Sequence, residues 1–404
     1  MPSILIITNG PLCRNPRPLK EAETLGRSGY DVTLLTVRNH EPSEANDREI
    51  LRNAPFRRVT VDLLPGMGCP GAVVWQRRIR QRLARSLATR LGLPLMEALG
   101  PASALLRQAR RLPADLTIVH NEVPHWVGTR LLSIGRRVAA DMEDWHTEDL
   151  LPEERAGRPL ARMRATERVL LNHAAYVSTT SQALADALWS RHGGRRPVVI
   201  SNAFPLQPDP HQGAPVEPPA FFWFSQTLGP GRGLGLFLAA WGLTRHPSRL
   251  VLLGQPRAGF AGELLARLPE DRRGRVEFLP LAPPAALASI IARHDVGLAL
   301  EQPFILNRDL TITNKILQYL HAGLAVVASN TAGQREVLAH APAAGLLVNL
   351  QETTRLASEL DQLLADQPAL AARQRAARQL AVDHYCWEHE VPRLLAAVAG
   401  TFQY

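Results

Sequence analysis

Short runs of apolar residues alternate with amphipathic segments along the first half of the chain. The apolar runs, each long enough for one strand, are at 3–8, 31–37, 58–64, 115–120, 137–142, 175–180 and 197–202. Segments with apolar residues at helical spacing separate them, at about 19–28, 75–92, 101–111, 124–134, 159–173 and 181–191. Short, fully apolar strands between helices are typical of a parallel sheet covered on both faces. The first half therefore predicts an α/β domain.

A proline-rich segment interrupts this pattern after Phe204. Six prolines lie between 205 and 219, a density that cannot continue a helix or an inner strand. The alternation then resumes, with apolar runs at 221–226, 249–255, 276–281, 295–301, 325–329 and 345–350. We therefore predict an α/β fold of two doubly wound Rossmann-like domains, 1–204 and 220–384, joined by a linker at 205–219. Ligands bind at the carboxyl ends of such sheets, so we expect the domains to face each other across a ligand-binding cleft.

Composition narrows the class of protein. Of the 404 residues, 46% are hydrophobic and 21% are charged, which excludes a disordered or collagen-like chain. Cys13, Cys69 and Cys386 are too few and too scattered for a disulfide framework or a Cys-rich zinc site. No apolar run approaches the roughly 18 residues that span a bilayer, and the first run is too short for a signal peptide. We therefore expect a cytoplasmic protein.

Two segments of the second half have the features of a phosphate site. The loop SQTLGPGRGLG at 225–235 follows a strand and opens a helix, where glycines and free N–H groups suit a phosphate and Arg232 adds a charge. Lys315 lies in the first turn of a predicted helix at 314–323, where a cation opposes the helix dipole unless an anion is near. The alternatives are a flexible turn and a solvated lysine.

Polar residues follow the strands of the first half. Arg14, Arg17 and Lys20 lie in the segment 9–22 after the first strand, and we expect them to line the cleft. His120 ends the strand at 115–120, and Glu143, Asp144 and His146 follow the strand at 137–142. Such side chains suit acid–base work or hydroxyl binding, although helix capping and loop solvation are the alternative. Their spacing fits no standard zinc motif, so we expect no metal.

A basic amphipathic helix is predicted at 73–92. Apolar residues recur every four positions at Trp75, Ile79, Leu83 and Leu87, and arginines cover much of the remainder. The helix suits an anionic membrane surface, or it packs its apolar stripe onto its own domain. Nucleic acid is not expected as a partner, because the arginines are not interleaved with aromatic residues and no reader motif is present.

The ordered set of these motifs resembles the GT-B glycosyltransferases, particularly the retaining group that uses nucleotide sugars (glycosyltransferase family 4-like). In the first half the resemblance rests on RPLKEA at 17–22, DLTIVH at 115–120 and AADMEDWH at 139–146. In the second half it rests on FSQTLGPGRGL at 224–234, DVGLALE at 295–301 and NKILQYLHAGLAVVAS at 314–329. It also implies that the terminal segment 385–404, which opens with YCWE, is a helix that crosses back over the first domain.

The resemblance implies a transfer from a nucleotide-diphosphate sugar to a hydroxyl acceptor, without a cofactor. The expected donor-binding residues are Gln226, Gly231, Arg232, Gly254, Glu301, Thr313, Asn314, Lys315 and Gln318. The expected acceptor-side residues are Asn9, Gly10, Arg14, Arg17 and His146, and the expected catalytic residues are His120, Glu143 and Asp144. A glycan or lipid-linked acceptor would place the enzyme in cell-envelope polysaccharide or glycolipid synthesis, at the inner face of the membrane.

Two positions depart from the family's pattern. Many retaining members carry two glutamates eight residues apart, where this chain has Leu310 and Gln318. The family's histidine after the strand at 137–142 is replaced by Glu143. Leu310 and Gln318 make a non-catalytic partner subunit one alternative function. A sugar-nucleotide epimerase is the other, because such enzymes share the two-domain fold.

Overall fold

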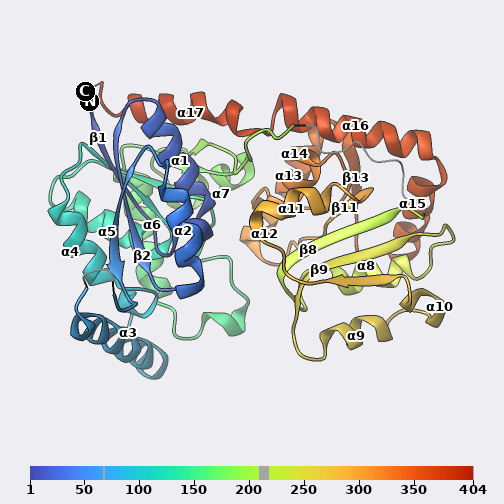
Figure 1. Ribbon diagram of the computed structural model, residues 1–404, viewed down its shortest axis with the longest axis horizontal. Helices are drawn as coiled ribbons and strands as arrows, with labels where there is room; N and C mark the ends of the chain where they lie inside the picture. Colours follow the sequence, from blue (N-terminus) through green and yellow to red (C-terminus); the bar gives the residue numbers. More distant parts are fainter. Residues whose placement is uncertain (67–68, 209–217, 404) are drawn as a thin grey trace. The chain divides into compact units, whose positions relative to one another are not determined.

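The computed structural model describes residues 1–66, 69–208 and 218–403. Most of the predicted linker, 209–217, lies outside the described residues. The chain divides into two compact units, of which the first contains Met1–Ile200 with Val391–Tyr404 and the second contains Ser201–Glu390. Figure 1 shows each unit as a sheet flanked by helices.

The first unit contains a seven-stranded parallel sheet in the order β3-β2-β1-β4-β5-β6-β7. Its strands are β1 (Ser3–Ile7), β2 (Asp31–Arg38), β3 (Arg57–Asp62), β4 (Leu116–His120), β5 (Val138–Met142), β6 (Val177–Thr179) and β7 (Val198–Val199). Its main helices are α1 (Pro16–Arg27), α2 (Glu44–Leu51), α3 (Gly71–Leu91), α4 (Ala102–Arg111), α5 (Glu122–Leu132), α6 (Leu160–His173) and α7 (Gln182–His192). Every predicted strand of this half is confirmed, whereas α2 was not predicted.

The second unit repeats this arrangement with six parallel strands in the order β10-β9-β8-β11-β12-β13. The strands are β8 (Ala220–Leu228), β9 (Arg249–Pro256), β10 (Val276–Leu279), β11 (Val296–Ala299), β12 (Ala325–Ser329) and β13 (Gly345–Val348). The helices are α8 (Leu234–Trp241), α9 (Phe260–Ala266), α10 (Glu270–Arg273), α11 (Pro284–Ile291), α12 (Leu306–Leu310), α13 (Asn314–His321), α14 (Ala332–Ala339), α15 (Thr353–Ala365) and α16 (Gln367–Asp383). The predicted doubly wound α/β class is thus confirmed.

Both faces of the second sheet are buried. Successive residues of β8 point to opposite faces, so Phe221 and Trp223 join one apolar cluster and Phe222 joins the other. This two-sided burial explains why the strands read as continuous apolar runs rather than as alternating ones. In each unit the strand order reverses beside the first strand, between β1 and β4 and between β8 and β11. Such a reversal leaves an opening at the carboxyl ends of the strands.

The last helix, α17 (Trp387–Ala399), begins in the second unit, and its residues from Val391 onward belong to the first. Beyond it, the ring of Phe402 stacks on Tyr30, with centroids 6.2 Å apart, and lies 5.8 Å from the guanidinium of Arg137. Within the described ranges, no helix combines the length and the hydropathy required to cross a bilayer.

Candidate functional site

The carboxyl ends of β1 and β4 are tied together by Asn121. Its side-chain oxygen accepts hydrogen bonds from the Thr8 hydroxyl at 2.8 Å and from the Asn9 backbone N–H at 3.2 Å. Asn121 has a φ of 69° and is the one non-glycine residue with positive φ in the described part of the chain. Strain of this kind collects at functional sites, so it points to the strand ends of the first unit as a candidate site.

Four charged side chains form a buried cluster below these strand ends. Arg17 of α1 is completely buried and donates to both carboxylate oxygens of Asp141, at 3.0 and 2.7 Å, and to the carbonyl of Ile200 at 2.6 Å. The ring nitrogens of His120 lie 3.2 Å from Glu21 and 3.2 Å from Asp141. Two cations therefore balance two carboxylates where water is excluded, as buried charges require.

The protonation of the cluster follows from its charges. Burial lowers the pKa of His120, but the carboxylates of Glu21 and Asp141 outweigh it and raise that pKa to about 10. Burial raises the pKa of Asp141, but the charges of Arg17 and His120 hold it well below its usual range. His120 is therefore an imidazolium at neutral pH.

Two predictions for this unit are corrected by burial. Arg17 does not line a surface, because its side chain has no exposed area. His120 is 1% exposed and already protonated, so it neither reaches a substrate nor accepts a proton. Both side chains lie inside the buried cluster instead.

The cluster has the donor set of a metal site but not its charge. Ligand atoms of Glu21, His120 and Asp141 lie within 4.8 Å of one another. However, the Arg17 guanidinium is 2.7 Å from Asp141 and 3.4 Å from Glu21, so it supplies the positive charge that a metal ion would bring. The residues present do not fit a metal.

Glu143 is the half-buried acid next to this cluster. Burial, followed by the charge of Asp144, raises the pKa of Glu143 to about 7, and the charge of Arg17 opposes this rise. A carboxyl group with this pKa can exchange a proton at neutral pH, which His120 cannot. The structure therefore brings Glu143, Asp144, Arg17 and His120 together and leaves Glu143 as the acid–base group among them.

The other predicted residues of this unit lie around the same edge. His146 is half-buried; burial lowers its pKa, but Glu122 and other carboxylates outweigh that effect and raise it. Gly10, at φ 146°, and the half-buried Asn9 follow β1. Arg14 is exposed at the end of a short 3₁₀ helix, Leu12–Arg14, and nothing in the described structure joins it to the cluster.

In the second unit, the glycine-rich loop lies between β8 and α8. Gly231 and Gly233 have φ values of 78° and 77°, and a Cβ on Gly233 would collide with the carbonyl oxygen of Leu300. Gly254, at φ 147°, is packed in the same way against the carbonyl of Ser225. The absence of a side chain at Gly233 lets the loop lie close against Leu300, and Gly233 is also the N-cap of α8.

Glu301 is the buried acidic residue with which basic side chains of this unit interact. Lys315 donates a 2.6 Å hydrogen bond to the Glu301 carboxylate, and its Nζ is 5.5 Å from the ring centre of Trp223. Burial raises the pKa of Glu301, but Lys315 and, further along, Arg232 and Arg308 outweigh it and lower that pKa. Lys315 is thus neither the solvated lysine nor the unpaired cation that the sequence allowed, because Glu301 is the anion beside it.

Polar atoms without partners surround the start of α13. Among the described residues, the buried Thr313 Oγ1 and Gln318 Oε1 have no hydrogen-bond partner. Asn314 is exposed and accepts a 3.0 Å hydrogen bond from the side chain of Asn202. Buried polar groups are normally paired, so such atoms mark positions where a ligand can bind. Gln226, the remaining predicted donor residue, is exposed on β8.

The segment with this geometry matches a known family. Residues 219–366 match the family model described as glycosyl transferases group 1. Sucrose-phosphate synthase from Thermosynechococcus elongatus is similar in structure, with a TM-score of 0.73 and 16% identity over 100% of this chain and 99% of that chain. HepE of Anabaena in complex with UDP-glucose is similar with a TM-score of 0.69 and 17% identity, over 99% of this chain and 100% of that chain. WaaG, described as a glycosyltransferase involved in lipopolysaccharide biosynthesis, is similar with a TM-score of 0.63 and 14% identity, over 98% of this chain and 99% of that chain. A search among curated proteins found no match.

The chain has the GT-B fold, and its residues 219–366 match the group 1 glycosyltransferase family.

One buried polar residue in the matched segment, Gln334, was not predicted as part of the site. Gln334 of α14 is buried; its amide donates to the Ser329 hydroxyl at 2.9 Å, and its Oε1 has no partner among the described residues. Ser329 in turn donates to the backbone carbonyl of Glu301. The GQREV segment at 333–337 could have indicated Gln334, but only the fold places it beside the carbonyl of Glu301.

Proposed function

We propose that this glycosyltransferase transfers a sugar from a nucleoside-diphosphate sugar to a hydroxyl group of a glycan or lipid-linked acceptor. The supporting observation is that the segment matched by the group 1 family contains the glycine-rich loop, Arg232 and the unpartnered oxygens of Thr313 and Gln318. The HepE structure holds UDP-glucose, and it shares the fold. A uridine diphosphate sugar is therefore the donor that we infer.

The second unit holds the donor in this proposal. Arg232 is half-buried and donates no hydrogen bond to a described residue, so its guanidinium is available to a diphosphate. Lys315 is held by Glu301 and acts through the local charge balance. As the bond to the sugar breaks, the leaving diphosphate gains negative charge. Arg232 and the N–H groups at the start of α8 stabilise that charge more than they stabilise the ground state.

The first unit holds the acceptor in this proposal. Glu143, with a pKa of about 7, is the residue able to accept or share the proton of the acceptor hydroxyl, and Asn9 and His146 lie at the same edge of the sheet. The protein's own cations take the role of a metal ion, so we propose a metal-independent reaction. Retention of configuration is part of the proposal because the sequence resembles the retaining group. The acceptor's chemistry places the reaction in polysaccharide or glycolipid synthesis at the cytoplasmic face of a membrane.

Isothermal titration calorimetry with UDP tests the donor site. We expect Arg232→Ala to weaken UDP binding by at least tenfold, because a charge-assisted hydrogen bond contributes about 1.5–3 kcal/mol. Thr313→Val removes only the unpartnered hydroxyl and should weaken binding without lowering the melting temperature. Arg293→Ala, which removes an exposed arginine beyond α11, is the matched control and should bind UDP as the wild type does. Wild-type affinity in Arg232→Ala and Thr313→Val would refute the assignment of the site.

A further inference from the structure

Helix α3 exposes a long apolar stripe. Trp75, Leu83 and Leu91 are 68%, 59% and 65% exposed, and Ile79 and Leu87 are also exposed between them. These five residues, spaced four apart, occupy five turns of a helix of 21 residues, which is about 30 Å long. Soluble proteins rarely leave a contiguous apolar surface of this extent unpartnered.

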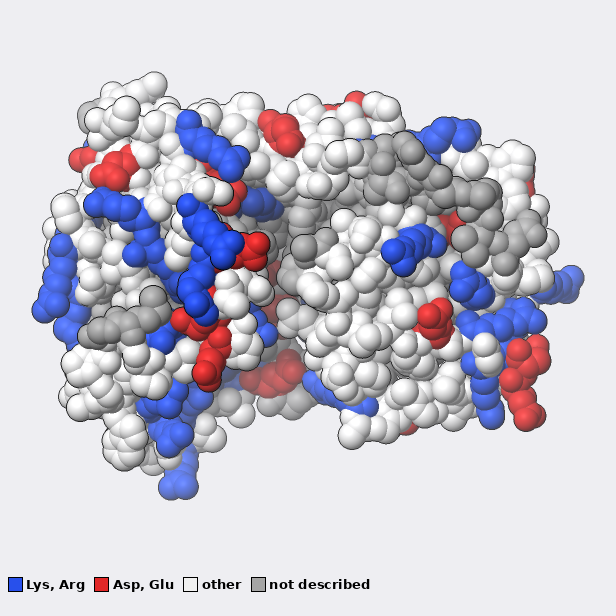
Figure 2. Space-filling view, viewed as in Figure 1, with Lys and Arg blue, Asp and Glu red and all other residues white. Residues whose placement is uncertain are grey.

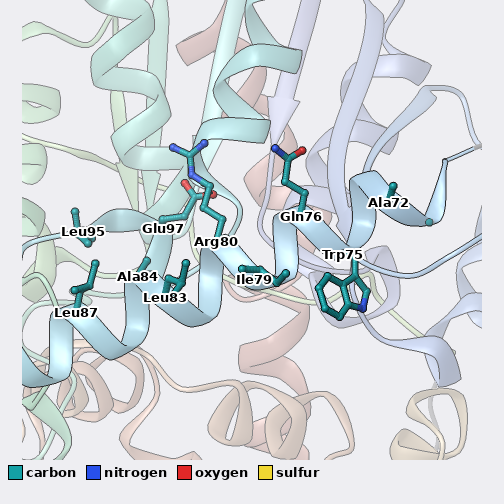
Figure 3. Close-up of a pocket in the computed structure, with 11 residues that line it drawn as sticks. Ala72, Trp75, Gln76, Ile79, Arg80, Leu83, Ala84, Leu87, Leu95 and Glu97 are labelled. Carbon is teal, nitrogen blue, oxygen red and sulfur yellow. The ribbon is translucent and has the colours of Figure 1, made fainter.

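Small side chains of α3 fix the helix to its domain. Ala84 and Ala88 form a small buried cluster with Ala98, and Leu95 packs against it. Between α3 and the segment at 95–97 runs an open groove of about 840 Å³, and four residues of the stripe, Trp75, Ile79, Leu83 and Leu87, are part of its lining. Figure 3 shows Gln76 and Arg80 on one side of the helix, with Glu97 beside Arg80, and Trp75 on the other. The stripe thus faces outward on a supported helix.

All charged residues of α3 are basic. The helix contains six arginines and no acidic residue. Four of them, Arg77, Arg78, Arg80 and Arg85, are held by hydrogen bonds to neighbouring segments of the domain. Arg82 and Arg90 are exposed and donate no hydrogen bond to a described residue. Figure 2 shows Lys and Arg side chains projecting from the edge of the first unit where Figure 1 places α3.

We propose that α3 binds an anionic lipid bilayer, with its axis along the surface, its apolar stripe among the acyl chains, and Arg82 and Arg90 against the headgroup phosphates. This inference deepens the proposed function, because it rests on the membrane location of the acceptor and names the surface that provides it. A basic helix with an outward apolar face is the physical form of an interfacial anchor. The apolar stripe and the two exposed arginines, Arg82 and Arg90, then both contact the bilayer.

Other occupants fit this face less well. A second copy of the chain would bring six further arginines against the first six, with no acidic residue on either α3 to offset them. Nucleic acid would pair with the arginines but would leave the aliphatic stripe in water. A bilayer with anionic headgroups satisfies both parts of the surface.

Co-sedimentation of the full-length protein with vesicles tests the inference. Wild-type protein should pellet at low salt with vesicles that contain phosphatidylglycerol, and much less with pure phosphatidylcholine. Trp75→Gln with Leu83→Gln should weaken binding at least tenfold, and Arg82→Gln with Arg90→Gln should weaken it by about fivefold per arginine. The Trp75 contribution to fluorescence, taken as wild type minus Trp75→Phe, should shift to the blue on the vesicles and be quenched by brominated acyl chains.

Two matched variants provide the controls. Ile134→Gln with Leu243→Gln removes two exposed aliphatic side chains that do not belong to α3, and Arg110→Gln with Arg111→Gln removes two exposed charges from α4. Both should bind vesicles as the wild type does. Equal losses in control and α3 variants, no pelleting at low salt, no quenching of Trp75, or vesicle binding displaced by duplex DNA would each overturn the proposal. UDP affinity is measured in parallel: unchanged affinity in an α3 variant separates failure at the membrane from failure of the donor site.

Discussion

His120 carries its proton at neutral pH because two carboxylates face its ring nitrogens. The sequence places this histidine at a strand end, which is also where an acid–base catalyst would lie. Only the structure shows Glu21 on one side of the ring and Asp141 on the other, each at 3.2 Å. The same strand-end position therefore holds a buried, charged histidine, and the half-buried Glu143 is the neighbour whose pKa, about 7, lies near neutral pH.

The pH dependence of stability tests this assignment. Burial lowers the pKa of His120, and Glu21 and Asp141 outweigh it to give a pKa of about 10, above the usual 6.5. Because the folded-state pKa is raised, the stabilisation is complete below about pH 6.5 and is lost as pH rises toward about 10. From this group we expect the free energy of unfolding to fall by up to about 1.4 kcal/mol per pH unit in that window.

Urea denaturation of the wild type and of His120→Gln at pH 7 and pH 9 measures this slope. The variant should be less stable at pH 7 and should show a smaller fall between the two pH values. Should the variant not fold, the ¹⁵N shifts of the wild-type ring at pH 8.5 still report its state. A neutral imidazole at that pH, or equal slopes in the two proteins, would contradict the assignment.

At the scale of the element, the loop between β8 and α8 contains two glycines with similar backbone angles but different surroundings. Both have positive φ, at 78° for Gly231 and 77° for Gly233. A Cβ on Gly231 meets nothing within 4 Å, whereas a Cβ on Gly233 meets the backbone of Leu300. Gly231 is therefore needed only for its left-handed backbone conformation, whereas Gly233 is needed for that conformation and for close packing against Leu300.

Alanine at each position measures the two effects. Gly231→Ala should cost about 1 kcal/mol of unfolding free energy from backbone strain. Gly233→Ala should cost about 2 kcal/mol more, because the added carbon displaces the loop from β11. It should also weaken UDP binding more strongly in the same calorimetric titration. Equal losses in the two variants would show that close packing of this loop is unimportant.

Elements were predictable from the sequence where local pattern decides them. Strands such as β4 read clearly because both faces of the sheet are buried, and Gly323 ends the predicted helix at 314–323 close to the observed end of α13. The ion pairs were not predictable, because they join distant residues: Arg17 and Asp141 are 124 residues apart. Glu21 was not singled out from the sequence, yet it is 1% exposed and faces His120. The sequence therefore predicted which strand ends carry polar residues. Which of those residues are buried in ion pairs depends on tertiary packing, and only the structure shows it.

At the scale of the whole molecule, the chain returns to the unit in which it began. Residues Val391–Tyr404 belong to the first unit although the second unit precedes them. Phe402 anchors this return through Tyr30 and Arg137. The two units have separate sheets and cores, so a change in one core is expected to be felt first in that unit.

Hydrogen exchange followed by mass spectrometry can assign stability to each unit. Phe402→Ala removes a stacked ring and a cation–π contact, and should lower protection in Met1–Ile200 by about 1–2 kcal/mol while leaving Ser201–Glu390 unchanged.

Saturating UDP should instead raise protection, and it should do so in the second unit. At 100 times its dissociation constant it should raise protection in the second unit by about 2.7 kcal/mol, because it binds the folded state there. Equal protection of both units by UDP, or loss of protection in the second unit on Phe402→Ala, would show that the units do not unfold independently. It would also show that donor binding cannot be assigned to one of them.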